Sequence, residues 1–222
     1  MRSFPFPDKI VSRDELTRDL LYEKIPKEDL NTIADKAWET GAAAAQAILE
    51  AYPGKTMAEI ARAEYLKVEY IPRDQIAGKV RYFSEYYSGP KKIYMYSNSI
   101  EKWAESNKLE KEDACELILS HEFFHHLECT RLGLTSKQYT VPRFRIGNVK
   151  IGAMTIRALS EIGAHGFSYT FYQNRNVQSK DYLRNHAVND MVFSGHKKAE
   201  KIFEDNPVMR FLTGKNKEKN HG

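Results

Sequence analysis

The sequence feature that most constrains the fold is a long helix with histidines near its middle. Residues 111–133, KEDACELILSHEFFHHLECTRLG, place acids in the first turn and a glycine at the end, as helices commonly do. On a helical wheel His125 lies roughly 40° from His121. The opposite side, at roughly 160–240°, is apolar: Leu119, Phe123 and Leu127. Because both sides need a covering element, this helix is expected to run through the interior of the fold.

The centre of this helix reads HEFFHH and contains the pattern HExxH. The imidazoles of His121 and His125 lie one turn apart on one face and can converge on a single metal ion. Glu122 lies beside that face, where a carboxylate can take a proton from water activated by a metal. The alternative is an aromatic core helix without chemistry, since short motifs also match by accident. A third potential ligand elsewhere in the sequence would favour the metal site over an aromatic core helix.

Glu161, in ALSEIGAHGF, is the strongest candidate for that ligand. It lies between apolar residues on a second helix, where an unpaired carboxylate is costly to bury. Three protein ligands leave a fourth tetrahedral place for water, as catalytic zinc requires. The alternative is an exposed glutamate on a surface face. His165 follows one turn later and can orient a ligand, steady an oxyanion or form the cleft wall.

The remaining pattern indicates an α+β protein in one domain over residues 1–222, because no repeat or long linker divides it. We expect a helical N-terminal part at 8–66, a core at 56–175 and a helical C-terminal extension at 179–213. The expected details are: capping boxes at 12–15 and 56–59, helices at 27–52 and 57–66, strands at 67–71 and 92–97, a helix capped by residues 98–101, a helix at 155–174, and a last helical region from Ser179, broken near Gly195 and ending around Pro207.

The segment 142–152 predicts a β-hairpin around the loop Gly147-Asn148. In this register Ile146 pairs with Val149, Arg145 with Lys150, and Phe144 with Ile151. The apolar pairs share one face and the basic pair lies on the other. From 129 to 160 the chain has six basic residues and no acid, so an acidic neighbour is expected in the fold or on a substrate; a solvated basic face is the alternative. Nucleic acid is disfavoured because the aromatic residues do not interleave with the charges.

Bulk properties exclude several classes of protein. A net charge of +4 is mild, and no run of apolar residues approaches the roughly 18 that a membrane span needs. The first residues lack the apolar run of a signal peptide. Cys115 and Cys129 lie fourteen residues apart on the expected helix, about 21 Å, so they cannot form a disulfide there. Reduced thiols and these features favour the cytoplasm.

HEFFHH followed by EIGAHGF resembles the ImmA/IrrE family of zinc metallopeptidases, gluzincins with HExxH and a downstream E-x-x-A-[N/H]-x-F. The resemblance covers roughly residues 56–172. It implies a zincin-like fold, with the active-site helix packed against a small mixed or antiparallel sheet and flanking helices. It also implies one Zn²⁺ per chain, held by His121, His125 and Glu161, with Glu122 as general base and His165 supporting the site. Family members often cleave a transcriptional repressor.

Three features depart from the family pattern. The stretch between the motifs is long and holds the expected hairpin, SYTFYQNRNVQSKDY replaces the usual Pro-containing continuation, and residues 1–222 show no pattern of a helix-turn-helix partner domain. These departures leave the expected zinc chemistry in place and leave the substrate open.

The expected function is zinc-dependent hydrolysis of peptide bonds in a protein substrate, for example a regulatory or repressor protein. An edge strand formed by Ile93, Tyr94, Met95 and Tyr96 would bind the substrate backbone by strand addition, the alternative being an ordinary paired strand. Two other functions stay open: a non-catalytic protein-binding module that keeps the zinc site, and a zinc hydrolase of a non-peptide amide.

Overall fold

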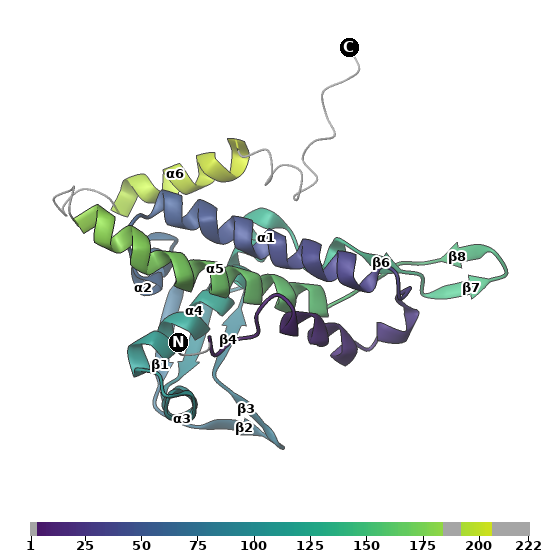
Figure 1. The fold of residues 1–222 in the computed structure, drawn as a ribbon, viewed down its shortest axis with the longest axis horizontal. Coiled ribbons are helices and arrows are strands. Elements are labelled where there is room, and N and C mark those ends of the chain that lie inside the picture. The colour runs from purple at the N-terminus through teal and green to yellow at the C-terminus, as the bar shows by residue number, and fades with distance from the viewer. Residues whose placement is uncertain (1–3, 184–191, 206–222) are drawn as a thin grey trace, which may run out of the picture.

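The structure is a computed structural model that describes residues 4–183 and 192–205, and it is α+β (Figure 1). The helices α1 (Leu30–Ala51) and α5 (Ala158–Leu183) run side by side, and α4 (Lys111–Leu127) packs on α5. On its other side α4 contacts the sheet and the shorter helices α2 (Met57–Ala63) and α3 (Ser97–Asn107). The HExxH helix is therefore enclosed between α5 and the sheet, as its apolar far side predicts.

The other elements are short. The helix α6 (Val192–Asp205) lies against α1. The strands are β1 (Lys67–Ile71), β2 (Gln75–Ala77), β3 (Val80–Tyr82), β4 (Ser84–Tyr87), β5 (Lys92–Tyr96), β6 (Thr140–Val141), β7 (Phe144–Ile146), β8 (Val149–Ile151) and β9 (Met154–Thr155). Short 3-10 helices cover Val11–Arg18, Tyr22–Lys24 and Thr135–Lys137, and a π-helical turn at Glu128–Leu132 extends α4.

Glycines let α5 approach α1 and α4 at once. A Cβ on Gly41 of α1 would lie 1.8 Å from the carbonyl oxygen of Gly163, and one on Gly166 would lie 2.3 Å from that of Trp38. A Cβ on Gly163 would also lie 2.8 Å from the ring of Phe124 on α4. Any larger residue would push the helices apart. This close packing holds the first turn of α5, with Glu161, against the motif helix.

The apolar core forms two clusters on either side of this helix pair. One contains Phe123 and Phe124 of α4 with Phe167 and Phe171 of α5 and the inner side of the sheet. The other joins α1 and the start of α5 to the N-terminal segment through Leu16. Burying these aromatic rings fixes the rotation of α4, and so turns His121 and His125 toward the first turn of α5.

The main sheet corrects one prediction. Its order is β1-β5-β4, with β1 parallel and β4 antiparallel to β5. The strand β1 has its predicted bounds, but Ile93, Tyr94, Met95 and Tyr96 belong to the central strand, so the prediction of an edge strand there is wrong. Both sides of their backbone already pair with neighbouring strands, which leaves no groups for a substrate strand. The edge beside α4 is β4.

Two other local predictions, both of side-chain caps at the start of a helix, are wrong. The expected capping box at Ser12 is absent: the helical turn begins after Asp8, whose Oδ1 accepts from the N–H groups of Ile10 and Val11, and Ser12 turns inward. The helix α3 begins at Ser97 without a side-chain cap. By contrast, the capping box of Thr56 and Glu59 is confirmed in full.

The C-terminal helices differ from the prediction as well. The helix α5 continues through Ser179 to Leu183, and α6 runs through Gly195 without a break. A side chain at 195 would collide with Tyr52, since a Cβ there would lie 2.3 Å from its ring. The glycine therefore serves close packing instead of ending a helix. The predicted end near Pro207 lies outside the described residues.

Within the part of the chain that the structure describes, no helix has both the length and the apolar character needed to cross a bilayer. Cys115 and Cys129 are both free thiols.

Candidate metal centre

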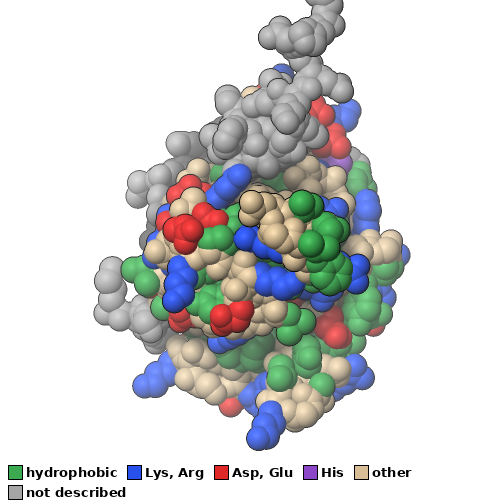
Figure 2. Space-filling model, turned by 90° about the vertical axis from the view of Figure 1, so that its right-hand side faces the viewer, with side chains coloured by type: hydrophobic (Ala, Val, Ile, Leu, Met, Phe, Trp, Pro, Cys, Tyr) green, Lys and Arg blue, Asp and Glu red, His purple; other side chains and the backbone are tan. Residues whose placement is uncertain are grey.

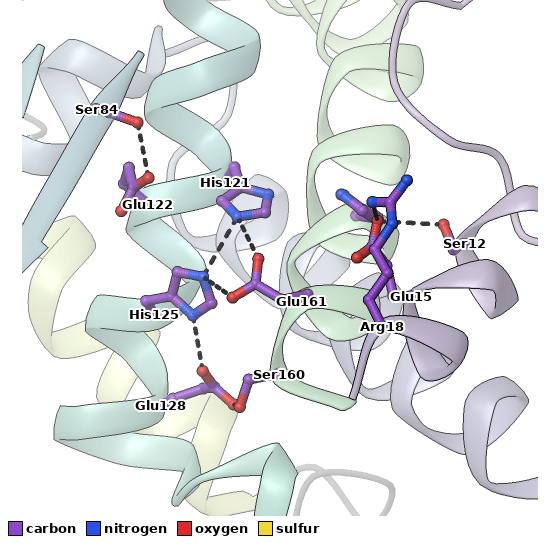
Figure 3. A network of polar contacts seen from close by, with 11 residues as sticks. Ser12, Glu15, Arg18, Ser84, His121, Glu122, His125, Glu128, Ser160 and Glu161 are labelled. Atoms are coloured by element: carbon purple, nitrogen blue, oxygen red, sulfur yellow. Dashed lines mark hydrogen bonds and ion pairs between the residues drawn. The ribbon is translucent and has the colours of Figure 1, made fainter. Parts of the chain in front are cut away.

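Three predicted ligand residues meet at the junction of α4 and α5 (Figure 3). The Nε2 atoms of His121 and His125 are 3.3 Å apart. One carboxylate oxygen of Glu161 lies 3.2 Å from His121 Nε2, and the other lies 3.7 Å from His125 Nε2. These residues form the one group of three or more potential metal ligands found among the described residues. The prediction that they meet is confirmed.

The separations suit a tetrahedral ion. Zinc binds imidazole nitrogen and carboxylate oxygen at about 2.0–2.2 Å, which places neighbouring ligand atoms roughly 3.3–3.5 Å apart. The three donor separations bracket this range. Two nitrogens and one oxygen from three residues also form the donor set of a zinc site with one place open. The residues present therefore fit the ion that the sequence implies.

Glu128 is the ligand-supporting residue that the sequence analysis missed. Its Oε2 lies 2.9 Å from His125 Nδ1, and its Oε1 accepts from the Thr135 N–H at 2.7 Å and the Ser160 hydroxyl at 2.9 Å. A carboxylate on Nδ1 leaves the Nε2 lone pair directed at the metal position. The spacing held a signal, because seven residues after His121 is roughly the same helical face.

Carboxylates dominate the electrostatics of the centre. Burial disfavours a charged His125, but the carboxylates of Glu128, Glu161 and Glu122 outweigh it and raise its pKa to about 9. Burial likewise opposes a charged Glu161, yet the hydrogen bond and charge of His121 lower its pKa to about 2. The carboxylates favour a cation at the site, and a metal ion that binds there at neutral pH displaces the proton of His125.

Glu122 points to the sheet side of α4, one residue along from the ligand face (Figure 3). Its Oε1 accepts from the hydroxyl of Ser84 at 2.7 Å, and Ser84 is the first residue of β4. The edge strand thereby holds the carboxylate beside the ligand trio. Sequence reasoning did not find Ser84, since nothing in the local pattern marks its contact with α4.

His165 lies next to His121, with ring centroids 5.4 Å apart, as its position one turn after Glu161 predicts. It is buried, and its Nδ1 lies 3.4 Å from the Ser12 hydroxyl. Burial, followed by the neighbouring His121, lowers the pKa of His165 to about 3, so the ring is neutral at pH 7. Phe6 of the N-terminal segment packs on both rings, 6.2 Å from His121 and 6.1 Å from His165.

The centre is open at Glu161. The side chain of Glu161 is 49% exposed, and it borders a cavity of about 660 Å³. The cavity walls come from the N-terminal turn around Arg18 and Leu21 and from residues 153–158. A molecule can thus reach the ligand trio from this cavity.

Comparisons with protein-family models, curated proteins and solved structures find no match for this chain.

Proposed function

We propose that the protein is a zinc-dependent endopeptidase with a zincin-like arrangement of its active-site helix. The observation that carries this proposal is the meeting of three donors, His121, His125 and Glu161, at separations that suit a tetrahedral ion, beside an oriented Glu122. Zinc held there supplies a Lewis acid that activates water near neutral pH and polarises a carbonyl.

The protein's own residues supply proton transfer. Glu122 accepts the proton of the attacking water and passes it to the leaving amine. Its hydrogen bond from Ser84 fixes one carboxylate oxygen and leaves the other for the proton. His165, a neutral buried ring under Phe6, holds the orientation of His121 by packing against it. It is a positioning residue in this proposal.

The substrate backbone is placed along β4 in place of the strand first expected. The strand β4 pairs with β5 on one side, and no other described strand pairs with its outer side. An extended peptide can add to that free edge, directly beside Glu122. This geometry and the family resemblance together support the proposal of an endopeptidase for extended segments of proteins, with a transcriptional repressor among the candidate substrates.

Metal analysis and peptide cleavage test the proposal. The purified protein should contain one zinc per chain, and His121→Ala should lose it. The zinc-loaded protein should cleave members of a fluorescence-quenched peptide mixture. Glu122→Gln should retain zinc while cleavage falls by about 10²–10⁴-fold, the usual contribution of a general base. Ser84→Ala serves as the milder variant, with zinc bound and cleavage reduced.

Three outcomes would contradict the proposal. If the purified protein binds no zinc, the proposed metal site is ruled out. Unchanged cleavage in Glu122→Gln removes the base. Bound zinc with no cleavage of any peptide supports the non-catalytic binding module, or a hydrolase for a different amide.

A further inference from the structure

The hairpin β7–β8 is an exposed ribbon that the proposed active site does not use. Its register is the predicted one, with Phe144 opposite Ile151 and Ile146 opposite Val149. These four side chains share one face and remain 44–69% exposed. Figure 1 shows the ribbon projecting from the helices at the end where β6 lies. Contiguous exposed apolar groups of this kind are uncommon on a soluble surface except where something binds.

The opposite face is basic and unneutralised. Arg145 and Lys150 face one another there, which is unfavourable for two like charges. Arg143 and Arg157 lie close by in sequence, and none of the four cations has an ion pair within residues 4–183 and 192–205. Figure 2 looks toward this end of the molecule and shows basic and apolar side chains next to each other on it. Glu23 borders the same pocket as Arg143 and Arg145, and Glu15, Asp19 and Glu161 border the cavity of Arg157, but none of them forms an ion pair with these cations among the described residues.

Neither outer edge of the ribbon pairs with another described strand, although Lys24 donates to the carbonyl oxygen of Arg143 at its base. Among the described strands, β7 pairs only with β8, so each has a row of backbone groups without a strand partner. An isolated two-stranded ribbon is marginally stable in water, and a third strand stabilises it. Side chains of an added strand alternate between the two faces. A segment that alternates acidic and apolar residues would therefore place acids on the basic face and apolar groups on the other.

The ribbon leads directly to the candidate active site. Its stem is the pair β6–β9, and Met154 and Thr155 of β9 line the cavity that borders Glu161. From Ala153 to the turn at Gly147 is six residues, about 20 Å of extended chain. A chain leaving the cavity can follow the stem outward along the hairpin. This continuity ties the ribbon to the occupant of the cavity.

We propose that β7–β8 is a docking arm that binds, as a third strand, an extended segment of alternating acidic and apolar residues in the protein substrate. The claim that this segment belongs to a substrate rests on the proposed peptidase function. Nucleic acid fits less well, because the ribbon carries one aromatic ring and its other apolar groups are aliphatic. A membrane also fits less well, because the leading tip is Gly147-Asn148 and offers no apolar side chain to insert.

Binding of designed peptides to the full chain carrying Glu122→Gln tests the arm without cleavage. The probe is a fluorescein-labelled peptide of four Glu-Val repeats, measured by fluorescence anisotropy. Its composition controls are a block peptide of four Glu followed by four Val, and four Lys-Val repeats. We expect the alternating acidic probe to bind at least tenfold more tightly than either control, with affinity falling as salt rises.

Substitutions on each face locate the binding. Arg145→Glu with Lys150→Glu, and separately Ile146→Ser with Val149→Ser, should each weaken the probe at least tenfold. The second exposed hairpin, β2–β3, and the first residue of β1 supply matched controls: Lys67→Glu with Lys79→Glu, and Ile76→Ser with Val80→Ser, should change affinity less than twofold. If a charge-reversed variant fails to fold by circular dichroism, Arg145→Gln with Lys150→Gln replaces it.

Several results would overturn the docking arm. If the hairpin variants bind the probe as tightly as the chain with an unsubstituted hairpin, the probe binds elsewhere on the protein. A block peptide that binds as well as the alternating one shows bulk charge attraction only. Tighter binding of duplex DNA or anionic vesicles through the same residues assigns the ribbon to those partners. A dimer that Ile146→Ser with Val149→Ser converts to monomer assigns it to a second copy. Because the assay uses an inactive variant and needs no zinc, loss of the peptidase proposal would leave these readouts unchanged.

Discussion

Two adjacent histidines on α4 show how differently its two faces are built. His125 faces Glu161 and Glu128, and those carboxylates outweigh burial and raise its pKa to about 9. His126 points to the other side, where burial lowers its pKa to about 4; the charge of Glu64 favours protonation, but those of Lys91 and Arg131 oppose it. One residue of helical rotation thus separates a histidine surrounded by negative charge from one kept neutral.

The face of His126 holds its own cluster of histidine and carboxylate. Buried Glu64 accepts from the Tyr52 hydroxyl and from both terminal nitrogens of Arg131, and it lies 2.9 Å from His196 Nδ1. Glu161 has no Lys or Arg ion pair among the described residues, so its charge is left for another cation. Both faces hold imidazole and carboxylate, so the difference between the structural network and the candidate metal centre is the arginine that neutralises the carboxylate in the network.

The largest expected effect is on the Arg131 side of the helix. Glu64→Gln leaves the guanidinium of Arg131 buried without its counter-charge, so we expect a loss of about 3–5 kcal/mol in the free energy of unfolding. Urea unfolding of the metal-free protein measures it. The control is Glu101→Gln, which removes the exposed pair with Lys111 and should cost about 1 kcal/mol or less. Equal effects of the two substitutions would show that the buried network contributes no more than a surface pair.

The next largest effect is on zinc affinity and concerns only the face of α4 that carries His125. Glu128→Gln removes the carboxylate from His125 Nδ1, and we expect zinc affinity to fall about 10–100-fold, as for other residues that support metal ligands. Competition with a chromophoric chelator measures it. Glu112→Gln, an exposed residue in the first turn of α4, should leave affinity unchanged. If Glu128→Gln also left it unchanged, the carboxylate would have only a structural role in binding the loop at Thr135.

Local sequence rules predict some parts of this molecule well. The register of β7–β8 follows from a two-residue turn and alternation, and the approach of His121 to His125 follows from helical spacing. The strand order does not follow from such rules, because β1 and β5 are distant in sequence and their pairing depends on the whole fold. The sequence therefore predicts the strands β1 and β5 correctly and assigns the sheet edge to the wrong one.

The candidate site divides in the same way. Glu161 could be predicted because a carboxylate among apolar residues needs a partner. Glu128 lies on nearly the same helical face as His121 and His125, but it lies outside the HExxH motif, so the motif does not point to it. Ser84 and Ser12 contact Glu122 and His165 from segments 38 and 153 residues away, and no pattern near either serine announces this. Contacts that distant segments make with the site can be found only from the structure.

The smallest effect is a pH dependence that tells the two neighbouring histidines apart. In the folded protein His126 has a pKa of about 4 and His165 of about 3, against about 6.5 when unfolded. Below pH 6.5 the unfolded chain therefore binds more protons than the folded one, and stability falls as pH falls toward 4.5. His125 has the opposite shift, so its contribution changes only between about pH 9 and 6.5 and is constant in the acid range.

Each neutral buried histidine should contribute a slope approaching about 1.4 kcal/mol per pH unit in this range. In metal-free protein, His126→Gln should remove one of the two slopes between pH 6.5 and 4.5, while the amide keeps a group that can hydrogen bond to Tyr86. Staying above pH 4.5 avoids the titration of Glu161, whose pKa is about 2. Urea unfolding at each pH measures the slope. An unaltered slope would mean that His126 already takes up its proton in the folded state, and that the two faces of α4 differ less in charge than their contacts indicate.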